Sequence, residues 1–362
     1  MHAAADIPIR NLGWVQNVGN LEPMLEIHVM HASPKKRVTV AVAQVSSVGF
    51  DAEATLAKLG TYAREAAEKG AELVLFPEAF VGTYPRGLSF GATIGNRTID
   101  GRNDFVRYFD NAITVPGPAT KFISDIAAAN HLYIVTGVIE RDGRTLYCTA
   151  LFFGPDGDLL GKHRKLMPTA SERLIWGYGD GSTMPVFDTP IGKMGAAICW
   201  ENYMPLMRMA YYAKGIELYL APTADGRETW LPTMRHIAIE GRCFVLSCNQ
   251  FSRRRDYPDD YNIATTDPDT ILNTGGSCII SPMGEVLAGP NFEDECVLTA
   301  ELDMQDIARG KFDFDVVGHY ARPDVFSLTV SERALPPVVI KVDSGQAGND
   351  TQRNSAAAQT AS

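Results

Sequence analysis

The sequence predicts a layered α/β fold. Apolar runs rich in β-branched residues alternate with amphipathic segments of helical period from Arg37 to about Asp303. The runs VAVAQV, LVLF, LYIV and VLSC are almost continuously apolar, as strands buried under helices must be. A composition of 45% hydrophobic and 21% charged residues is typical of a soluble globular protein with a large core.

The first half of the alternation begins with RVTVAVAQVS (37–46), which predicts a strand. An amphipathic segment from about Asp51 to Lys69 predicts a helix, and ELVLFPEAF (72–80) predicts the next strand. The pattern then predicts a helix around 118–130, a strand in HLYIVTGVIE (131–140), and a hairpin in LYCTALFFGPDGDLLG (146–161), which a Pro-Asp-Gly turn interrupts.

The second half continues in the same way. It predicts strands in MGAAICW (194–200), IELYLAP (216–222) and CFVLSCNQ (243–250), and helices near 204–214 and 229–242. The segments GGSCIISPMGEVLAGP (275–290) and ECVLTAELD (295–303) predict two further strands around a Pro-Met-Gly turn, with a helix starting near Asp303.

The chain divides into one folded domain and two flanking segments. Residues 1–36 have no sustained period and are predicted to form an irregular N-terminal extension, and the domain covers 37–330. Residues 331–362 form a C-terminal tail, which we expect to be disordered after Ser344 because Gly, Gln, Asn, Ser and Ala dominate there.

Charge and hydropathy exclude several classes of partner. A formal charge of −10 would repel nucleic acid and anionic membrane surfaces. No stretch reaches the roughly 18 apolar residues of a membrane span, and residues 1–36 lack the order of a secretory signal. We therefore expect a cytoplasmic protein that binds neither nucleic acid nor membranes.

Neither a metal nor an organic cofactor is expected. The six cysteines form no C-x-x-C pair, and the seven histidines are scattered without metal-ligand spacing. There is no G-K-[ST] loop, no H-E-x-x-H and no G-x-G-x-x-G after a strand. Five of the cysteines lie in or beside apolar runs, where a small buried side chain is the simplest interpretation.

The sixth cysteine, Cys199, is one of three reactive residues at the ends of predicted strands. Glu78 follows ELVLFP, Lys165 follows the hairpin, and Cys199 closes MGAAIC. Ligands of α/β sheets gather at the carboxyl ends of strands, so these positions favour a site. Taken singly, each residue has an ordinary structural explanation: core packing for Cys199, a solvated basic patch for Lys165 and a helix cap for Glu78.

Together the three residues could perform nucleophilic catalysis. A thiolate is a strong nucleophile, and its pKa falls near a helix N-terminus or a cation, a role that Lys165 could fill. A carboxylate such as Glu78 could take the thiol proton and later activate water.

The sequence motifs around these residues resemble those of the nitrilase branch of the carbon-nitrogen hydrolase superfamily, and the resemblance extends from about Arg37 to Leu328. LVLFPEAF (73–80), KHRKLMPTASERLIWGYGDGST (162–183) and IGKMGAAICWENYMPLMR (191–208) resemble its glutamate, lysine and cysteine blocks, in the family's order. Further strings resemble plant-type nitrilases and their bacterial relatives: YPRGLSFG (84–91), HIAIEGRCF (236–244) and VGHYARPDVF (317–326).

The resemblance implies a role for each residue of the site. Glu78 would be the general base, Lys165 would stabilise the charged intermediate, Cys199 would be the nucleophile, and Glu172 would hold the lysine. The other implied residues are Tyr84 and Trp200, which would line the substrate pocket, and Glu201 and His236, which would support the site from behind. For His236, a hydrogen-bonded histidine on a buried helix face is an equal alternative.

The resemblance also implies a fold, an assembly and a reaction. The fold would be a four-layer α-β-β-α sandwich, and the chain would form a homo-oligomer, which in the family is often a spiral or filament. The enzyme would need only a small nitrile and water. It would form a thioimidate and then a thioester on Cys199, and it would release the carboxylic acid and ammonia, with an amide as the competing product.

Alternatives remain open at this point. An amidase or carbamoylase of the same superfamily would use the same four residues, although the local strings favour a nitrilase. A protein of another class, an inactive filament-forming scaffold, would be free to lose those residues. GLSFG (87–91) matches the G-x-S-x-G elbow of serine hydrolases, but its neighbours predict a loop rather than a strand and helix. The substrate itself would be selected by loops in 80–110, 166–180 and 223–230, and arylacetonitriles, arylaliphatic and aliphatic nitriles and β-cyanoalanine all remain candidates.

Overall fold

The computed structural model describes residues 35–261, 263–336 and 338. Its larger sheet has six strands in the order β15-β1-β2-β5-β6-β7. The strands β1, β2 and β5 are parallel, and the other neighbours are antiparallel. Their bounds are β1 (Arg37–Gln44), β2 (Leu73–Leu75), β5 (Tyr133–Asp142), β6 (Thr145–Phe153), β7 (Leu159–Arg164) and β15 (Cys296–Asp303). The predicted hairpin around the Pro-Asp-Gly turn is the pair β6 and β7.

The smaller sheet has five strands in the order β14-β13-β10-β9-β8. Here β8, β9 and β10 are parallel, and β13 and β14 extend the sheet antiparallel. The bounds are β8 (Met194–Ala196), β9 (Leu218–Thr223), β10 (Phe244–Asn249), β13 (Ser277–Ile280) and β14 (Val286–Asn291). The Pro-Met-Gly turn separates β13 from β14, so the region 275–303 holds three strands, where two were predicted.

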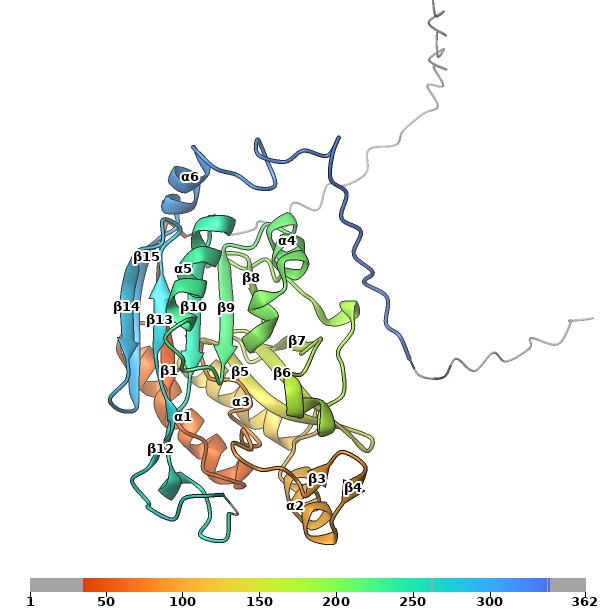
Figure 1. The fold of residues 1–362 in the computed structure, drawn as a ribbon. Helices are drawn as coiled ribbons and strands as arrows, with labels where there is room; N and C mark the ends of the chain where they lie inside the picture. Colours follow the sequence, from red (N-terminus) through yellow and green to blue (C-terminus); the bar gives the residue numbers. More distant parts are fainter. Residues whose placement is uncertain (1–34, 262, 337, 339–362) are drawn as a thin grey trace, which may run out of the picture. The chain divides into compact units, whose positions relative to one another are not determined.

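The two sheets pack face to face, and helices cover their outer faces (Figure 1). The first helical layer consists of α1 (Ala52–Glu68) and α3 (Pro118–Asn130), which share an apolar core with the larger sheet. The second consists of α4 (Pro205–Ala213) and α5 (Trp230–Gly241), packed on the smaller sheet. This is the predicted four-layer α-β-β-α sandwich.

Several shorter elements surround the layers. Helix α2 was not predicted: its core-facing apolar residues, Phe105, Tyr108 and Phe109, are confined to its second half, and only Gly101 and Tyr108 of its residues are buried. GLSFG forms a loop, as predicted, with Gly87 and Gly91 in the left-handed region. The bounds are α2 (Ile99–Asp110), α6 (Gln305–Lys311), β3 (Ala92–Thr93), β4 (Asn96–Arg97), β11 (Phe251–Arg253), β12 (Ile271–Thr274) and the 3-10 helices Ala170–Leu174, Gly181–Thr183, Cys199–Tyr203 and Arg254–Asp256.

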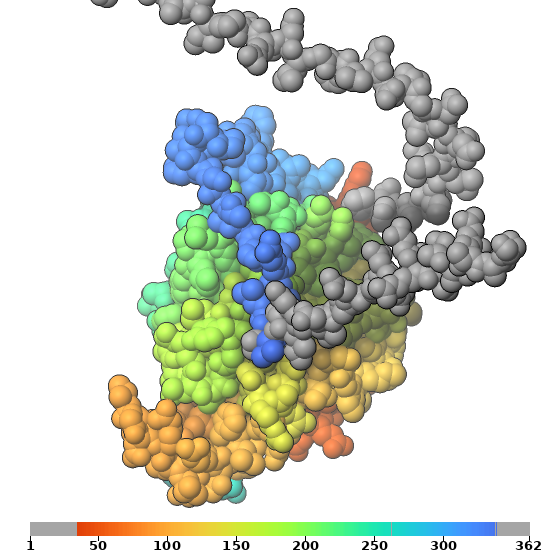
Figure 2. Space-filling model, turned by 90° about the vertical axis from the view of Figure 1, so that its right-hand side faces the viewer, coloured from red at the N-terminus to blue at the C-terminus, as the bar shows by residue number. Residues whose placement is uncertain are grey.

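Residues 312–336, which follow α6, cross the molecular surface without regular structure (Figure 2). They are attached to the domain by an ion pair of 2.5 Å between Lys214 and Glu332 and by the Leu335 N–H, which donates to Asp180 at 2.8 Å. Most of the predicted N-terminal extension and the tail after Ser344 lie outside the described residues. Within the described part, every helix is too short or too polar to cross a bilayer.

Candidate active site

The three reactive residues lie at the ends of strands from both sheets. Glu78 follows β2 and Lys165 follows β7 in the larger sheet, and Cys199 follows β8 in the smaller sheet. All three side chains are buried. The sandwich therefore brings together residues that are far apart in the sequence.

The Glu78 segment approaches β5 closely, and Gly137 permits this. A Cβ atom on Gly137 would lie 2.3 Å from the Pro77 carbonyl oxygen and 2.7 Å from the Glu78 Cα, so a side chain would displace the segment. On its other side, Gln250 donates to the Glu78 carbonyl oxygen at 3.2 Å. These contacts fix the backbone of Glu78 independently of the contacts that its side chain makes.

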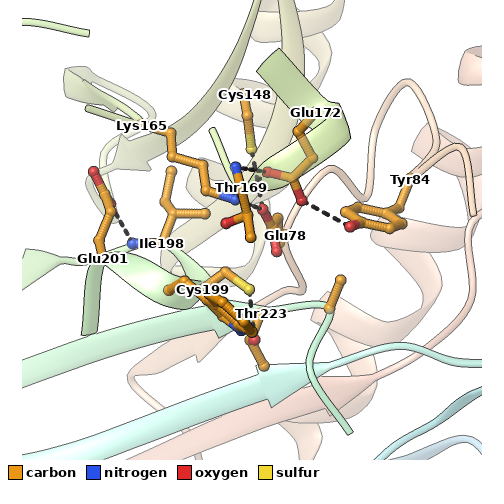
Figure 3. A network of polar contacts seen from close by, with 12 residues as sticks. Glu78, Tyr84, Cys148, Lys165, Thr169, Glu172, Ile198, Cys199, Glu201 and Thr223 are labelled. Carbon is orange, nitrogen blue, oxygen red and sulfur yellow. Dashed lines mark hydrogen bonds and ion pairs between the residues drawn. The ribbon is translucent and has the colours of Figure 1, made fainter. Parts of the chain in front are cut away.

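The Lys165 ammonium bridges two carboxylates (Figure 3). Its Nζ lies 2.6 Å from Glu78 Oε1 and 2.8 Å from Glu172 Oε2. Glu172 also accepts hydrogen bonds from the Tyr84 hydroxyl at 2.7 Å and from the Thr169 N–H at 2.7 Å. Both carboxylate oxygens of Glu172 therefore accept hydrogen bonds, which fix the orientation of the carboxylate. The oriented carboxylate in turn holds the Lys165 ammonium in place.

Cys199 occupies a strained position at the start of its 3-10 helix. Its φ of 53° lies in the left-handed region, which is uncommon for a residue with a Cβ. The Asn202 amide donates to the Cys199 carbonyl oxygen at 2.8 Å, and the Thr223 hydroxyl lies 3.3 Å from the sulfur. These contacts hold the thiol at the edge of the smaller sheet.

Burial and the paired carboxylates set the charges of the site. Burial opposes the charge of Lys165, but Glu78, Cys199 and Glu172 outweigh it and hold the pKa of the ammonium well above its usual value. Burial raises the pKa of Glu78, although Lys165 opposes that rise. The site thus combines a permanently charged lysine with a carboxylate that is more basic than usual.

The pKa of Cys199 moves opposite to our expectation. We expected the nearby lysine to lower the pKa of the thiol, but burial and the Glu78 carboxylate raise it to about 12, and Lys165 and Thr223 offset only part of this. Cys199 is therefore a thiol at neutral pH, and it could act as a nucleophile only if a base accepted its proton. The raised pKa of Glu78 narrows the difference in basicity between the two groups, which favours the transfer.

Glu201 joins the segments that carry the lysine and the cysteine. Its carboxylate accepts the N–H of Leu166, the residue after Lys165, at 2.6 Å, and the N–H of Ile198, the residue before Cys199, at 2.6 Å. The third partner is His163 Nε2 at 2.8 Å. Glu201 is fully buried and does not line the pocket, so its supporting role stays a prediction that these contacts favour.

His163 was missing from our sequence interpretation. Its Nδ1 lies 2.6 Å from the Thr183 carbonyl oxygen, so both ring nitrogens face acceptors and the ring must be an imidazolium. Burial lowers the pKa of His163, but the Glu201 carboxylate outweighs it and the net pKa is raised. The signal was available: His163 shares a strand face with Lys165, since alternate residues of a strand point to the same side.

The expectation for His236 is wrong. Its side chain is 63% exposed and pairs with Glu240 one turn along α5, at 3.2 Å. The buried face of α5 is formed by Met234, Ile237 and Ala238, so His236 points to the outside. It neither supports the site nor lies on a buried helix face.

A pocket of about 470 Å³ opens onto Cys199. Tyr84, Glu172 and Trp200 line it together with Cys199, and the predicted substrate loops supply residues 84, 86, 169, 172 and 224–227. The segment 272–274 also lines the pocket and was not predicted. The Trp200 indole N–H donates to Asp225 at 2.9 Å, so one wall of the pocket is fixed by a buried carboxylate.

Two further residues beside the site were not singled out from the sequence. Thr223, at the end of β9, contacts the Cys199 sulfur, and Cys148 Sγ lies 3.6 Å from Glu78 Oε1. Of the five cysteines expected to be buried apolar residues, four are buried and Cys296 is half-buried. Cys148 is buried in the apolar core, as expected, but it also contacts the Glu78 carboxylate.

Comparison with known proteins gives a consistent result. The model of the carbon-nitrogen hydrolase family matches residues 39–312. A bifunctional nitrilase/nitrile hydratase of Nicotiana tabacum is 56% identical over 91% of this chain and 97% of its own length. Nitrilase 2 of Arabidopsis thaliana is 56% identical over 87% and 95%, and an aliphatic nitrilase of Sinorhizobium fredii is 57% identical over 83% and 98%.

Solved structures show the same fold at lower identity. An amidase of the nitrilase superfamily from Nesterenkonia matches with a TM-score of 0.58 and 21% identity, covering 77% of this chain and 96% of that one. At this identity the likeness concerns the fold alone.

Proposed function

Since the chain belongs to the carbon-nitrogen hydrolase family, in its nitrilase branch, we propose that it hydrolyses an organic nitrile to the carboxylic acid and ammonia, with Cys199 as the nucleophile. The observation that carries this assignment of roles is the Lys165 ammonium, which bridges Glu78 and Glu172 beside a buried thiol at the base of a pocket. Glu78 then acts as the general base, and Glu172 holds the lysine.

The first step joins the substrate to the enzyme. The thiol proton of Cys199 passes to Glu78 as the sulfur adds to the nitrile carbon, and the developing negative charge on nitrogen is countered by Lys165. Glu78 returns the proton to that nitrogen. The product is a thioimidate, in which one carbon-nitrogen π bond has been exchanged for a carbon-sulfur bond.

The second step introduces water. Glu78 takes a proton from a water molecule as the water oxygen adds to the thioimidate carbon, and it passes this proton to the nitrogen. The result is a tetrahedral species with hydroxyl, amino and thioether groups. Loss of ammonia leaves a thioester, which a second water hydrolyses to the acid and the free thiol. If the thiol leaves instead, the product is the amide, so acid and amide arise from the same intermediate.

The experiment that tests this proposal measures ammonia release from a panel of nitriles and their matching amides. We expect release from nitriles by the wild type, and a loss of at least about 10³-fold in the Cys199→Ala variant because the covalent route is removed. Ser89→Ala, in the exposed G-x-S-x-G loop, is the matched control and should retain activity.

Other outcomes identify the rivals. Release from amides alone would replace the nitrilase by an amidase or carbamoylase. A wild type that releases no ammonia from either class, although it folds and assembles, would favour the inactive scaffold. Activity that survives in Cys199→Ala but disappears in Ser89→Ala would reassign the nucleophile.

We also propose that copies of the chain associate through the outer helical layer of the smaller sheet. In support, an apolar groove of about 980 Å³ lies between α4 and the segment 316–330, with Leu206 68% and Phe326 77% exposed. Leu206→Asp should reduce the mass measured by light scattering after size-exclusion chromatography. An unchanged mass in this variant, or a monomeric wild type, would contradict the proposal.

A further inference from the structure

Cys148 contacts both the base and the lysine of the site. It lies on β6, fully enclosed, and its Sγ is 3.6 Å from Glu78 Oε1, a normal separation for a thiol that donates to an oxygen (Figure 3). Its carbonyl oxygen accepts the Lys165 N–H at 2.8 Å. One residue of the larger sheet therefore contacts the Glu78 carboxylate with its side chain and the Lys165 backbone with its carbonyl oxygen.

The two oxygens of Glu78 have different surroundings. Oε1 faces the Lys165 ammonium and the Cys148 thiol. Oε2 is buried, and no hydrogen bond of normal geometry reaches it from the described residues. The Cys199 thiol is close enough to the same carboxyl group to lower the pKa of Glu78. Oε2 is thus the oxygen left for the proton of Cys199, and the groups on Oε1 determine which way it points.

Cys148 cannot replace Cys199 as the nucleophile. Burial and the Glu78 carboxylate raise the pKa of the Cys148 thiol well above its usual value, so the S–H bond stays intact across the working range of pH. Cys148 is also absent from the residues that line the pocket. What remains for this side chain is the donation of a hydrogen bond.

We propose that Cys148 is a positioning residue for the general base, whose S–H anchors Glu78 Oε1 and keeps Oε2 turned toward Cys199. This inference rests on the proposed function, because it takes Glu78 as the base. Without the donor, the carboxyl can rotate about its terminal bond while it remains paired with Lys165. A smaller fraction of molecules then presents Oε2 to the thiol, so kcat falls while KM changes little.

The pH profile distinguishes this role from simple packing. A donor to a carboxylate favours its ionised form, so removal of the S–H raises the pKa of Glu78 and moves the acidic limb of kcat/KM to higher pH. The charged and titratable groups that face Glu78 from the other elements are unchanged in such a variant; they are Lys165, Glu172, Cys199 and Tyr84.

The test compares variants of Cys148 with and without a donor. Cys148→Ala and Cys148→Val lack the donor, and the second of them keeps the volume of the side chain filled; Cys148→Ser keeps a donor. We expect the two variants without a donor to lose about 10-fold in kcat and to shift the acidic limb upward by about half a pH unit, as suits a weak hydrogen bond. Cys148→Ser should restore the position of the limb.

Cys278 offers a matched control. It is equally buried, on β13, and burial alone raises the pKa of its thiol. Cys278→Ala should lower the melting temperature but leave the pH profile unchanged. If Cys148→Ala and Cys148→Val share the wild-type profile, or if they lose only melting temperature, Cys148 is a packing residue and the inference fails. Two further results distinguish this inference from the proposed function. A wild type that releases no ammonia from nitriles would refute the proposed function, whereas an active Glu78→Gln variant would refute the role of Glu78 as the base, on which this inference depends.

Discussion

Replacement of Lys165 by methionine is expected to abolish turnover and to destabilise the fold. The ammonium is the shared partner of Glu78 and Glu172, and all three groups are removed from most contact with water. Its loss leaves two carboxylates side by side in a buried site, at a cost of about 3–5 kcal/mol in the free energy of unfolding. Activity should fall by about 10³-fold or more, because the charge on the nitrile nitrogen loses its counter-charge. Steady-state kinetics and urea denaturation measure the two effects.

A double variant separates catalysis from stability. Lys165→Met combined with Glu172→Gln removes one of the uncompensated charges, so part of the lost stability should return while activity stays absent. Activity in Lys165→Met within about 10-fold of the wild type would contradict the proposed role of the lysine. Equal stability of the single and double variants would show that the two carboxylates do not repel each other there.

Replacement of Glu201 by alanine should have the next largest effect, although Glu201 does not line the pocket. The change leaves the imidazolium of His163 without its counter-charge and two backbone N–H groups without an acceptor. We expect a loss of about 3–5 kcal/mol in the free energy of unfolding and about 10²-fold in kcat, because the segments of Lys165 and Cys199 lose their common support.

Glu201→Gln is the matched control. The amide keeps the volume and one acceptor oxygen, so its effect should be intermediate. The pH dependence gives a second readout. The pKa of His163 is raised in the folded state, so the ion pair contributes its full stability below about pH 6.5, the unfolded value, and this is lost as pH rises through the folded pKa. That dependence should be absent in Glu201→Ala. Wild-type kinetics and stability in both variants would contradict the supporting role.

The strands were predictable because their burial under helices demands unbroken apolar runs. The helices α1, α3, α4 and α5 and most strands of both sheets follow the predicted segments, but β2 and β8 are shorter than predicted and β13 and β14 were predicted as one strand. Helix α2 was not predicted, because its core-facing apolar residues are confined to its second half and it buries few of its residues. The 3-10 helix at Cys199 also follows from contacts of the folded chain rather than from a local pattern.

The identity of the reactive residues was more accessible from the sequence than their surroundings. The sequence motifs indicated Glu78, Lys165 and Cys199, but a sequence gives only the separations of these residues along the chain. It could not decide that His163 faces Glu201 while His236 faces the outside. It also could not give the sign of the pKa shift of Cys199, since that sign depends on burial of the thiol and on the balance between the nearby Glu78 carboxylate and Lys165 ammonium.

Glu78 and Lys165 meet across 87 residues of chain, and Glu201 ties Leu166 to a segment 35 residues further on. Such contacts form late during folding, after the loops between them have been closed at an entropic cost. Neither sheet alone holds a complete set of reactive groups. An intermediate in which the two sheets have formed but have not yet packed together would therefore be inactive. Recovery of nitrile hydrolysis after dilution from denaturant would therefore time the last event of folding, the closure of one sheet on the other.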